Sequence, residues 1–425
     1  MTPFCTTAPS ETQSAPSPQV EGRYVLLQGS TPIYVDGTGS RWLDNLWAID
    51  AREHLSYIRD LTIASPTIRI DRATPQLASI DADPLLSRIR FVALPRANSR
   101  LQALAELPYM AAVLWRVVGQ ADIVHMGIAG WPYPLGWLGY PIAKARRKKT
   151  IVVVESAPWR VGQTGNASRG QRLLSALYES LGKRIVKGAE LKFFTTASYL
   201  RSLCGEASSN AHVVQASWIP ASQVIDDARL DVRLAPSDAS AQVVRIAFFG
   251  RLAEEKGVMV LLAAARALGS TSQLELDIYG DGPQREALQS AVDSEPELAA
   301  VHMRGTIAYG EALFTRLADY EYVIVPSLSD EQPRIVYDAY SQGIPVIASD
   351  TDGLRQCVHE GQTGLFFERG SVESLTTLLR QVQSQKGRSQ RIELARNGVK
   401  VARRMTHAAM HAARARLIAD YVEPV

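Results

Sequence analysis

The chain of 425 residues contains few cysteines and no long apolar segment. Its three cysteines, Cys5, Cys204 and Cys357, are far apart and have the spacing of neither a disulfide framework nor a metal site. We therefore expect a protein of the reducing cytoplasm. No run of about 18 uncharged apolar residues is present, so the sequence predicts no membrane-spanning helix. With 46% hydrophobic and 21% charged residues, the composition is typical of a water-soluble globular protein.

The start of the chain also lacks what a secretory signal needs, which is a basic region followed by an apolar core. It is rich in Pro, Ser and Thr, which predicts a disordered tail over residues 1–20. The remaining chain is too long for one ordinary hydrophobic core, so we expect two domains.

The net charge of +3 is unevenly distributed. Residues 101–200 contain 13 Lys and Arg against 5 Asp and Glu, and the densest cluster is Lys144, Arg146, Arg147, Lys148 and Lys149. One interpretation is a solvated helix end, where cations interact favourably with the helix dipole. The other is a surface attracted to a phosphorylated acceptor or to anionic lipid headgroups, which predicts a peripheral contact with the inner face of a membrane. Because aromatic side chains are not interleaved with these cations, we expect no nucleic acid partner.

Short β-branched runs alternate with amphipathic helical stretches, which is typical of a parallel sheet with crossover helices. A polar stretch over residues 219–242 has no sustained period and is predicted to be a linker. The sequence thus predicts two Rossmann-like, doubly wound domains facing a cleft, over residues 21–218 and 243–404. The last segment, 405–425, has an apolar stripe and is predicted to be a helix that packs back toward the N-terminal domain.

Several features of the second half follow predicted strands, and open parallel sheets bind ligands beyond the carboxyl ends of their strands. Gly250-Arg251 and Lys256-Gly257 follow the strand predicted at Val243–Phe249. Glycine permits close approach of the backbone to a ligand, and two cations on one loop suit a diphosphate. The turn at Gly280 follows the strand predicted at Leu274–Tyr279, although it lacks the third glycine of a dinucleotide fingerprint.

The segment after the strand predicted at residues 322–326 is the most informative. Pro333 suits the first turn of a helix, so the free amides of the residues that follow it would point toward an anion. Glu331 and Asp338 are seven residues apart, so a helix would return them to nearly one face, roughly 10 Å apart. This spacing predicts two carboxylates that accept hydrogen bonds from a sugar and a ribose, with the phosphates held between them by the two cations of the first loop.

In this order, the features resemble the donor domain of the family 4 retaining glycosyltransferases of GT-B fold, the bacterial polysaccharide-type group 1. The resemblance covers residues 243–370, where it also includes Gly305 ahead of a helix and the run Gly343-Ile344-Pro345-Val346; it covers the first half loosely. It implies the GT-B fold and the transfer of a sugar from a nucleotide-diphosphate sugar. No divalent metal is needed if the two cations of the first loop stabilise the departing diphosphate, and we expect no cofactor.

The resemblance further implies roles for single residues. Arg251 and Lys256 would contact the diphosphate, Glu331 the donor sugar, and Asp338 the ribose. The implied donor-binding residues are Gly250, Arg251, Lys256, Gly280, Thr306, Ile307, Glu331, Arg334, Ile335 and Asp338, with Thr306 and Ile307 near the base. Gln332, Pro333 and Arg334 replace a Gly-aromatic-Gly turn of the family, and Asp338 replaces a glutamate.

The first half offers fewer candidates. The acceptor-side candidates are turn and strand-end residues, namely Gly37, Gly39, Glu155 and Ser156. Gly29-Ser30 is an alternative to Gly37 and Gly39 for presenting backbone amides to the phosphates, and Glu155-Ser156 could equally be a capped turn. His125 ends a predicted strand and is either a core histidine or an active-site group near the sugar. Two carboxylate pairs, Asp81 with Asp83 and Asp350 with Asp352, have metal-like spacing, but their surroundings predict turns.

We therefore expect a metal-independent hexosyltransferase that moves a sugar, with retention, to a hydroxyl of a glycan or lipid-linked glycan in polysaccharide biosynthesis. The implied catalytic residues are Arg251, Lys256, Glu331 and His125. One alternative is a nucleotide-sugar epimerase or another enzyme on the GT-B scaffold. Another is a non-catalytic nucleotide-sugar-binding protein, because Gly127 stands where the family often has a second histidine.

Overall fold

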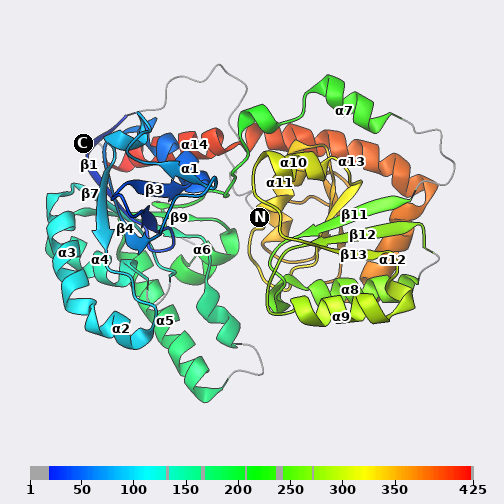
Figure 1. Cartoon of the computed structure of the whole chain (residues 1–425), viewed down its shortest axis with the longest axis horizontal. Helices are drawn as coiled ribbons and strands as arrows, with labels where there is room; N and C mark the ends of the chain where they lie inside the picture. The colour runs from blue at the N-terminus through cyan, green and yellow to red at the C-terminus, as the bar shows by residue number, and fades with distance from the viewer. Residues whose placement is uncertain are drawn as a thin grey trace. The chain divides into compact units, whose positions relative to one another are not determined.

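The computed structural model describes residues 19–130, 134–163, 168–205, 208–235, 243–269 and 272–422. The tail predicted over residues 1–20 therefore lies almost entirely outside the described residues. The described chain divides into two compact units (Figure 1). The N-terminal unit comprises residues 19–215 together with residues from His411 onward, and the C-terminal unit comprises residues 216–410.

The N-terminal unit is built on a ten-stranded sheet. Its strands are β1 (Val20–Leu27), β2 (Ile33–Val35), β3 (Arg41–Asp44), β4 (Ile58–Arg69), β5 (Leu77–Ser79), β6 (Arg90–Leu94), β7 (Ile123–Gly127), β8 (Lys149–Val154), β9 (Leu191–Phe194) and β10 (Ala211–Val213). The strand order is β10-β9-β8-β7-β1-β4-β2-β3-β5, and β6 also pairs with β4. All pairings are parallel except those of β3 with β2 and β5.

The helices of the N-terminal unit cover both faces of this sheet. They are α1 (Asn45–Leu55), η1 (Leu86–Arg88), α2 (Arg100–Ala105), α3 (Leu107–Gln120), α4 (Gly136–Ala145), η2 (Pro158–Gln163), α5 (Arg169–Gly188) and α6 (Ala197–Cys204). Because side chains alternate along a strand, Val124 and Met126 of β7 pack into the core shared with α3, α4 and α5. His125 points to the opposite face, where α1 and α14 (His407–Val422) lie.

The C-terminal unit is built on a six-stranded sheet whose pairings are all parallel, in the order β13-β12-β11-β14-β15-β16. Its strands are β11 (Val244–Phe249), β12 (Leu274–Tyr279), β13 (Val301–Gly305), β14 (Tyr322–Val325), β15 (Val346–Ser349) and β16 (Gly364–Phe367). Its helices are η3 (Ala221–Gln223), α7 (Asp227–Leu234), η4 (Glu254–Lys256), α8 (Val258–Leu268), α9 (Arg285–Ser294), η5 (Pro296–Leu298), α10 (Glu311–Leu317), α11 (Ile335–Ser341), η6 (Leu354–Gln356), α12 (Val372–Gln383) and α13 (Gln385–Arg404).

Two hydrophobic clusters fix the helices on this second sheet. One face of β11, β12 and β14 packs against α8 and α12, and the other face of β14 and β15 packs against α10 and α11. Strands buried on both faces need continuous apolar sequence, which is what the chain has from Ile246 to Phe249. The predicted α/β class with two parallel-sheet, Rossmann-like domains is thereby confirmed. No helix among the described residues is long and apolar enough to span a bilayer.

The predicted linker over residues 219–242 differs from the structure. Its described part contains α7, which is capped by the Asp226 carboxylate and packs Leu230 and Leu234 against Ala395 and Val399. The helix was missed because its two apolar residues stand among charged ones and show no longer period. The final helix, α14 (His407–Val422), begins in the C-terminal unit and continues in the N-terminal unit.

Candidate functional site

The carboxyl ends of β11, β12 and β13 are joined by glycine backbone. The Gly250 amide donates to the Tyr279 carbonyl at 3.0 Å, and the Gly280 amide donates to the Gly305 carbonyl at 2.7 Å. A Cβ atom on Gly280 would lie only 1.8 Å from the Gly250 carbonyl oxygen. The structure therefore places both predicted glycines at adjacent strand ends, where their lack of a side chain lets two loops pack in contact.

The loop after β11 also contacts the loop after β14. Gly257 adopts a left-handed conformation with φ of 68°, and a Cβ atom there would lie 1.8 Å from the Pro326 carbonyl oxygen. The Leu328 amide donates to the Glu255 carbonyl at 2.8 Å. This docking brings together two predicted site residues, because Lys256 Nζ lies 2.5 Å from Glu331 Oε2.

The Lys256–Glu331 ion pair remains accessible to a ligand. The two side chains keep 26% and 35% of their surface exposed. Arg251, on the same loop as Lys256, is exposed, and its side chain forms no hydrogen bond or ion pair with the described residues. The loop thus presents one paired and one unpaired cation at the carboxyl edge of the sheet, which is an arrangement suited to a diphosphate.

The expectation that Glu331 and Asp338 share a helix is wrong. Helix α11 begins only at Ile335, and Glu331 lies in an extended segment before it. The Gln332 side chain bonds both the amide (3.0 Å) and the carbonyl (3.2 Å) of Ala216, which fixes this segment. Gly353 packs against it so closely that a Cβ atom there would lie 2.5 Å from the Glu331 carbonyl oxygen.

Asp338 lies on α11 and is buried, with 2% of its surface exposed. The Tyr309 hydroxyl donates to Asp338 Oδ1 at 3.0 Å. Burial raises the pKa of the Asp338 carboxyl to about 7, while the Tyr309 hydrogen bond and the nearby charge of Arg334 act in the opposite direction. This carboxyl therefore changes charge near neutral pH.

Arg334 contacts two aromatic side chains that the sequence analysis did not single out. Its guanidinium lies 5.4 Å from the ring centre of Trp218 and 5.9 Å from that of Tyr309. Tyr309 could have been noticed, because it follows the end of β13 by four residues. Trp218 had no such signal, since it is more than a hundred residues from Arg334 in the chain.

The residues predicted to lie near the base are at the end of β13. Thr306 is exposed, and Ile307 is half-buried against Phe249 and Tyr279, whose rings are stacked with centres 4.7 Å apart. The neighbouring amides of Arg334 and Ile335 stand at the start of α11. All the donor-side residues predicted from sequence are thus on loops or helix starts at the carboxyl edge of one sheet.

The part of the chain that contains these donor-side residues is similar to known proteins. Residues 243–385 match the model of the family described as glycosyl transferases group 1. These residues form a glycosyl transferases group 1 domain. The sulfoquinovosyl transferase SQD2 of Arabidopsis thaliana is 28% identical over 153 residues, which are 35% of this chain and 28% of that protein. The match spans only about a third or less of the length of the curated relatives.

Solved structures resemble the chain beyond the group 1 domain. Sucrose-phosphate synthase from Thermosynechococcus elongatus has a TM-score of 0.68 at 18% identity, covering 93% of this chain and 98% of that one. Anabaena HepE in complex with UDP-glucose has a TM-score of 0.64 at 14% identity, again covering 93% and 98%. The fold of the whole chain is therefore that of the GT-B glycosyltransferase structures.

The raised pKa of Asp338 in the group 1 domain gives a pH prediction. Its pKa of about 7 in the folded chain lies above the ordinary value of 3.8, so between these values the folded chain binds a proton that the unfolded chain does not bind. The buried charge therefore destabilises the fold fully above pH 7, and this cost is absent below pH 3.8. We expect Asp338→Asn to stabilise the group 1 domain by roughly 4 kcal/mol at pH 8, with a gain that vanishes toward pH 4. Urea unfolding at both pH values checks this, with Asp352→Asn on an exposed loop as the control. Equal gains at the two pH values would contradict it.

The predicted glycine turn of the N-terminal unit is a hairpin between β2 and β3. The Asp36 carboxylate accepts hydrogen bonds from the amides of Thr38 and Ser40, at 2.9 and 3.1 Å. These amides are therefore engaged within the turn that contains Gly37 and Gly39. The Asp36 carbonyl also accepts from the Gly39 amide at 3.0 Å, so the amides of residues 38–40 already bond Asp36 rather than being free for a phosphate.

The alternative pair, Gly29-Ser30, lines a cavity of about 500 Å³ in the N-terminal unit. Residues that follow β6 line the same cavity, and its polar members are Ser30, Arg96, Asn98 and Glu106. These polar residues were not predicted, because the sequence shows no clear signal for β6. Glu155 and Ser156 follow β8, where Glu155 is exposed and its carbonyl accepts a hydrogen bond from the Thr195 hydroxyl at 3.1 Å.

His125 is a core residue in this structure. Only 5% of its surface is exposed, and Nδ1 lies 2.7 Å from the Tyr24 hydroxyl. Burial, with the positive charge of Arg414 and neighbouring histidines, holds the pKa of His125 well below its usual value. This position agrees with the interpretation of His125 as a core histidine rather than as an active-site group near the sugar.

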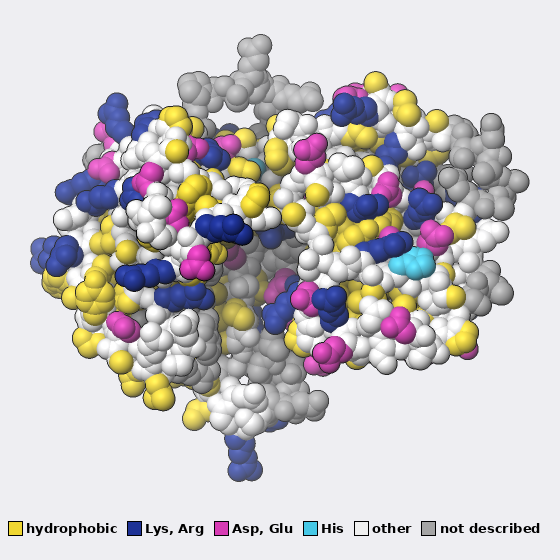
Figure 2. Space-filling view, in the orientation of Figure 1, with side chains coloured by type: hydrophobic (Ala, Val, Ile, Leu, Met, Phe, Trp, Pro, Cys, Tyr) yellow, Lys and Arg dark blue, Asp and Glu magenta, His cyan; other side chains and the backbone are white. Residues whose placement is uncertain are grey.

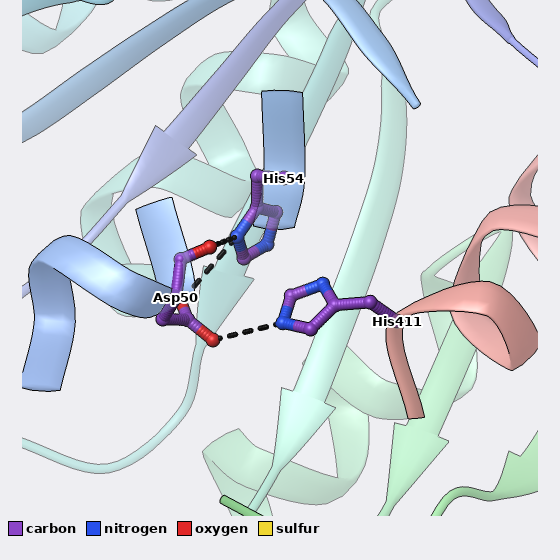
Figure 3. A group of neighbouring side chains, drawn as sticks. All are labelled: Asp50, His54 and His411. Atoms are coloured by element: carbon purple, nitrogen blue, oxygen red, sulfur yellow. Dashed lines mark hydrogen bonds and ion pairs between the residues drawn. The ribbon is translucent and has the colours of Figure 1, made fainter. Parts of the chain in front are cut away.

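A buried polar cluster lies beside His125 and joins α1 to α14. Asp50 and His54 project from α1 and His411 from α14 (Figure 3). His411 Nε2 donates to Asp50 Oδ1 at 3.0 Å, which leaves Nδ1 to accept from the Tyr57 hydroxyl at 3.2 Å. His54 Nδ1 lies 2.9 Å from the Asp50 carbonyl.

These three side chains are of the types that bind metals, and within the described residues they form the one group with suitable spacing. Their hydrogen bonds to one another already account for the arrangement. The carboxylates with metal-like sequence spacing are paired with arginines instead. Asp81 pairs with Arg41, Asp83 with Arg52, and Asp350 with Arg355.

Proposed function

We propose that the protein is a retaining glycosyltransferase that moves a sugar from a nucleotide-diphosphate sugar to a hydroxyl of a glycan or lipid-linked glycan. One observation carries the proposal: the Lys256–Glu331 pair, 2.5 Å apart, stands at the carboxyl edge of the sheet within the group 1 domain. The sequence relative SQD2 is named a sulfoquinovosyl transferase, and the structural neighbour HepE was solved in complex with UDP-glucose.

The proposed roles follow from charge and position. Lys256 and Arg251 would neutralise the diphosphate as its negative charge grows when the bond to the sugar breaks. Glu331, whose other carboxylate oxygen is not used by Lys256, would accept hydrogen bonds from the donor sugar. Asp338 with Tyr309 would accept or orient the ribose hydroxyls, and Thr306 and Ile307 would border the base.

We also propose that these cations replace a divalent metal and that no cofactor takes part. The support is chemical, since two positive side chains on one loop provide the charge that a metal would provide to the leaving diphosphate. Turnover that is unchanged after prolonged treatment with EDTA is the expected result. Loss of turnover that added Mg²⁺ or Mn²⁺ restores would reject this part of the proposal alone.

For the acceptor, we propose a glycan or lipid-linked glycan of a polysaccharide pathway, bound by the N-terminal unit. The cavity lined by Ser30, Arg96, Asn98 and Glu106 supplies hydrogen-bonding groups of both charges, which suits a polyhydroxylated molecule. An enzyme acting at the inner face of the membrane would meet a lipid-linked acceptor there.

A thermal-shift screen of nucleotide sugars tests the donor half of the proposal. A ligand that binds only the folded state at about 100 times its Kd stabilises the protein by about 2.7 kcal/mol. We expect one nucleotide sugar to raise the melting temperature and its free sugar to have no effect. The control is Glu331→Gln/Lys256→Met, which should abolish the shift. No shift with any nucleotide-diphosphate sugar would contradict the proposal, and a shift without transfer or hydrolysis would identify a non-catalytic binding protein.

A further inference from the structure

The segment of α2 and α3 exposes large apolar side chains to solvent. Leu101 and Leu104 of α2 are 81% and 67% exposed, and Tyr109 and Trp115 of α3 are 60% and 47% exposed. We call these four residues the α2–α3 apolar face. An exposed apolar group of this density on one short segment marks an interaction surface rather than ordinary scatter.

The arrangement of α3 explains why this face stays outside the core. Met110, Leu114, Val117 and Val118 follow a helical period and are buried against the sheet. Tyr109 and Trp115 lie off that stripe, together with exposed Ala112 and Arg116. The helix is therefore apolar on the face it buries and also on much of the face it exposes.

The basic cluster predicted from sequence adjoins this face. The Arg146 guanidinium lies 4.9 Å from the centre of the Trp115 ring. It crosses α3 at Gly119, where a Cβ atom would lie only 2.2 Å from Arg146 Nη2. Arg116 and Arg147 are exposed beside it. Figure 2 shows Lys and Arg side chains next to hydrophobic ones over α3, at the left of the view.

We propose that the α2–α3 apolar face and the adjoining arginines dock on an anionic lipid bilayer. Apolar side chains that enter the acyl boundary, flanked by cations that reach the headgroups, are what an interfacial membrane site requires. Charge complementarity selects this partner over an apolar protein surface, because Arg116, Arg146 and Arg147 have no acidic partner among the described residues.

The docked face would lie next to the proposed acceptor cavity. Glu106 and Met110, at the start of α3, line that cavity, while Leu104 and Tyr109 on either side of Glu106 belong to the exposed face. The junction of α2 and α3 would thus contact both the bilayer and the acceptor. This last step rests on the proposed function, whereas docking itself does not.

Sedimentation of the full chain with vesicles tests the docking. We expect the protein to bind vesicles that contain phosphatidylglycerol more tightly than pure phosphatidylcholine, and to lose affinity as salt is raised. Arg116→Gln/Arg147→Gln is expected to weaken binding by about 25-fold, at about fivefold per cation. Leu101→Ser/Leu104→Ser/Tyr109→Ser is expected to weaken it at least about tenfold.

Two controls make the assignment specific. Val232→Ser/Lys386→Gln removes an equally exposed apolar residue and a cation from the C-terminal unit and should bind as the unchanged protein does. Leu173→Ser/Leu177→Ser alters exposed leucines of α5. All variants should keep the thermal shift with the nucleotide sugar, which separates this test from that of the donor site.

Three outcomes would overturn the proposal. The unchanged protein could fail to sediment with anionic vesicles, or the α2–α3 variants could bind as tightly as the Val232 control. Weaker binding on substitution of α5 alone would place the surface elsewhere. A change of oligomeric state in the apolar variant, with vesicle binding unaltered, would instead identify the face as a contact between copies of the chain.

Discussion

Replacing Lys256 with alanine is expected to reduce turnover at saturating donor by about 10²–10³-fold. The lysine stands 2.5 Å from Glu331 at the carboxyl edge of the sheet, where the diphosphate is proposed to leave. Charge on the leaving group grows in the transition state, so a fixed cation lowers that state more than it lowers the bound substrate. Steady-state kinetics with the nucleotide sugar that gives the thermal shift is the measurement.

The stability of the fold should change little in this variant. The ion pair is partly exposed, and exposed pairs contribute about 0–1 kcal/mol. A loss of activity without a loss of melting temperature therefore reports on catalysis. Lys386→Ala, which removes an exposed lysine of α13 in the same unit, serves as the matched control. Turnover of Lys256→Ala equal to that of this control would reject the leaving-group role.

Replacing His411 with alanine is expected to destabilise the N-terminal unit by about 3–5 kcal/mol. The substitution removes the N–H that donates to the buried Asp50 carboxylate and the nitrogen that accepts from Tyr57. Without that N–H donor, the buried carboxylate still bears the free-energy cost of leaving water but loses a hydrogen bond that offset it. Urea unfolding followed by circular dichroism measures the change, and Arg416→Ala, an exposed position of the same helix, is the control.

The same histidine gives the stability of the unit a defined pH dependence. Burial lowers the pKa of His411 from its ordinary value of 6.5 to about 3, although the Asp50 hydrogen bond opposes the shift. Between these values the unfolded chain binds a proton that the folded chain does not bind. Stability is therefore fully present above pH 6.5 and falls by about 1.4 kcal/mol per pH unit as the pH decreases toward 3. In His411→Ala this slope should be smaller, and an unchanged slope would contradict the assignment.

Much of the C-terminal unit could be predicted because its signals are local. Strand β12 has the bounds that the sequence predicts, and β11 begins one residue after its predicted start. The apolar run from Ile246 to Phe249 identifies β11 as a strand buried on both faces. The loops that follow such strands must meet at one edge of a parallel sheet. That rule places the loops of Lys256 and Glu331 at the same edge of the sheet.

The parts that were missed depend on long-range contacts or on very short elements. Strands β2 and β5 have three residues each and show no alternation that could be detected. The extended conformation at Glu331 is fixed by Ala216 and Gly353, which are distant in the chain. Local sequence suggested a helix there because Pro333 is a good helix start, and nothing nearby shows that the helix begins two residues later.

The division of α14 between the two units has a consequence for biosynthesis. Asp50 of the N-terminal unit is synthesised well before the His411 that bonds it, because the C-terminal unit lies between them in the chain. Translation proceeds at about 5–20 residues per second, so some 360 residues separate the two partners by tens of seconds. During that interval the nascent chain lacks the His411 donor to the Asp50 carboxylate, and we expect the first unit to complete its folding only after the second has been synthesised.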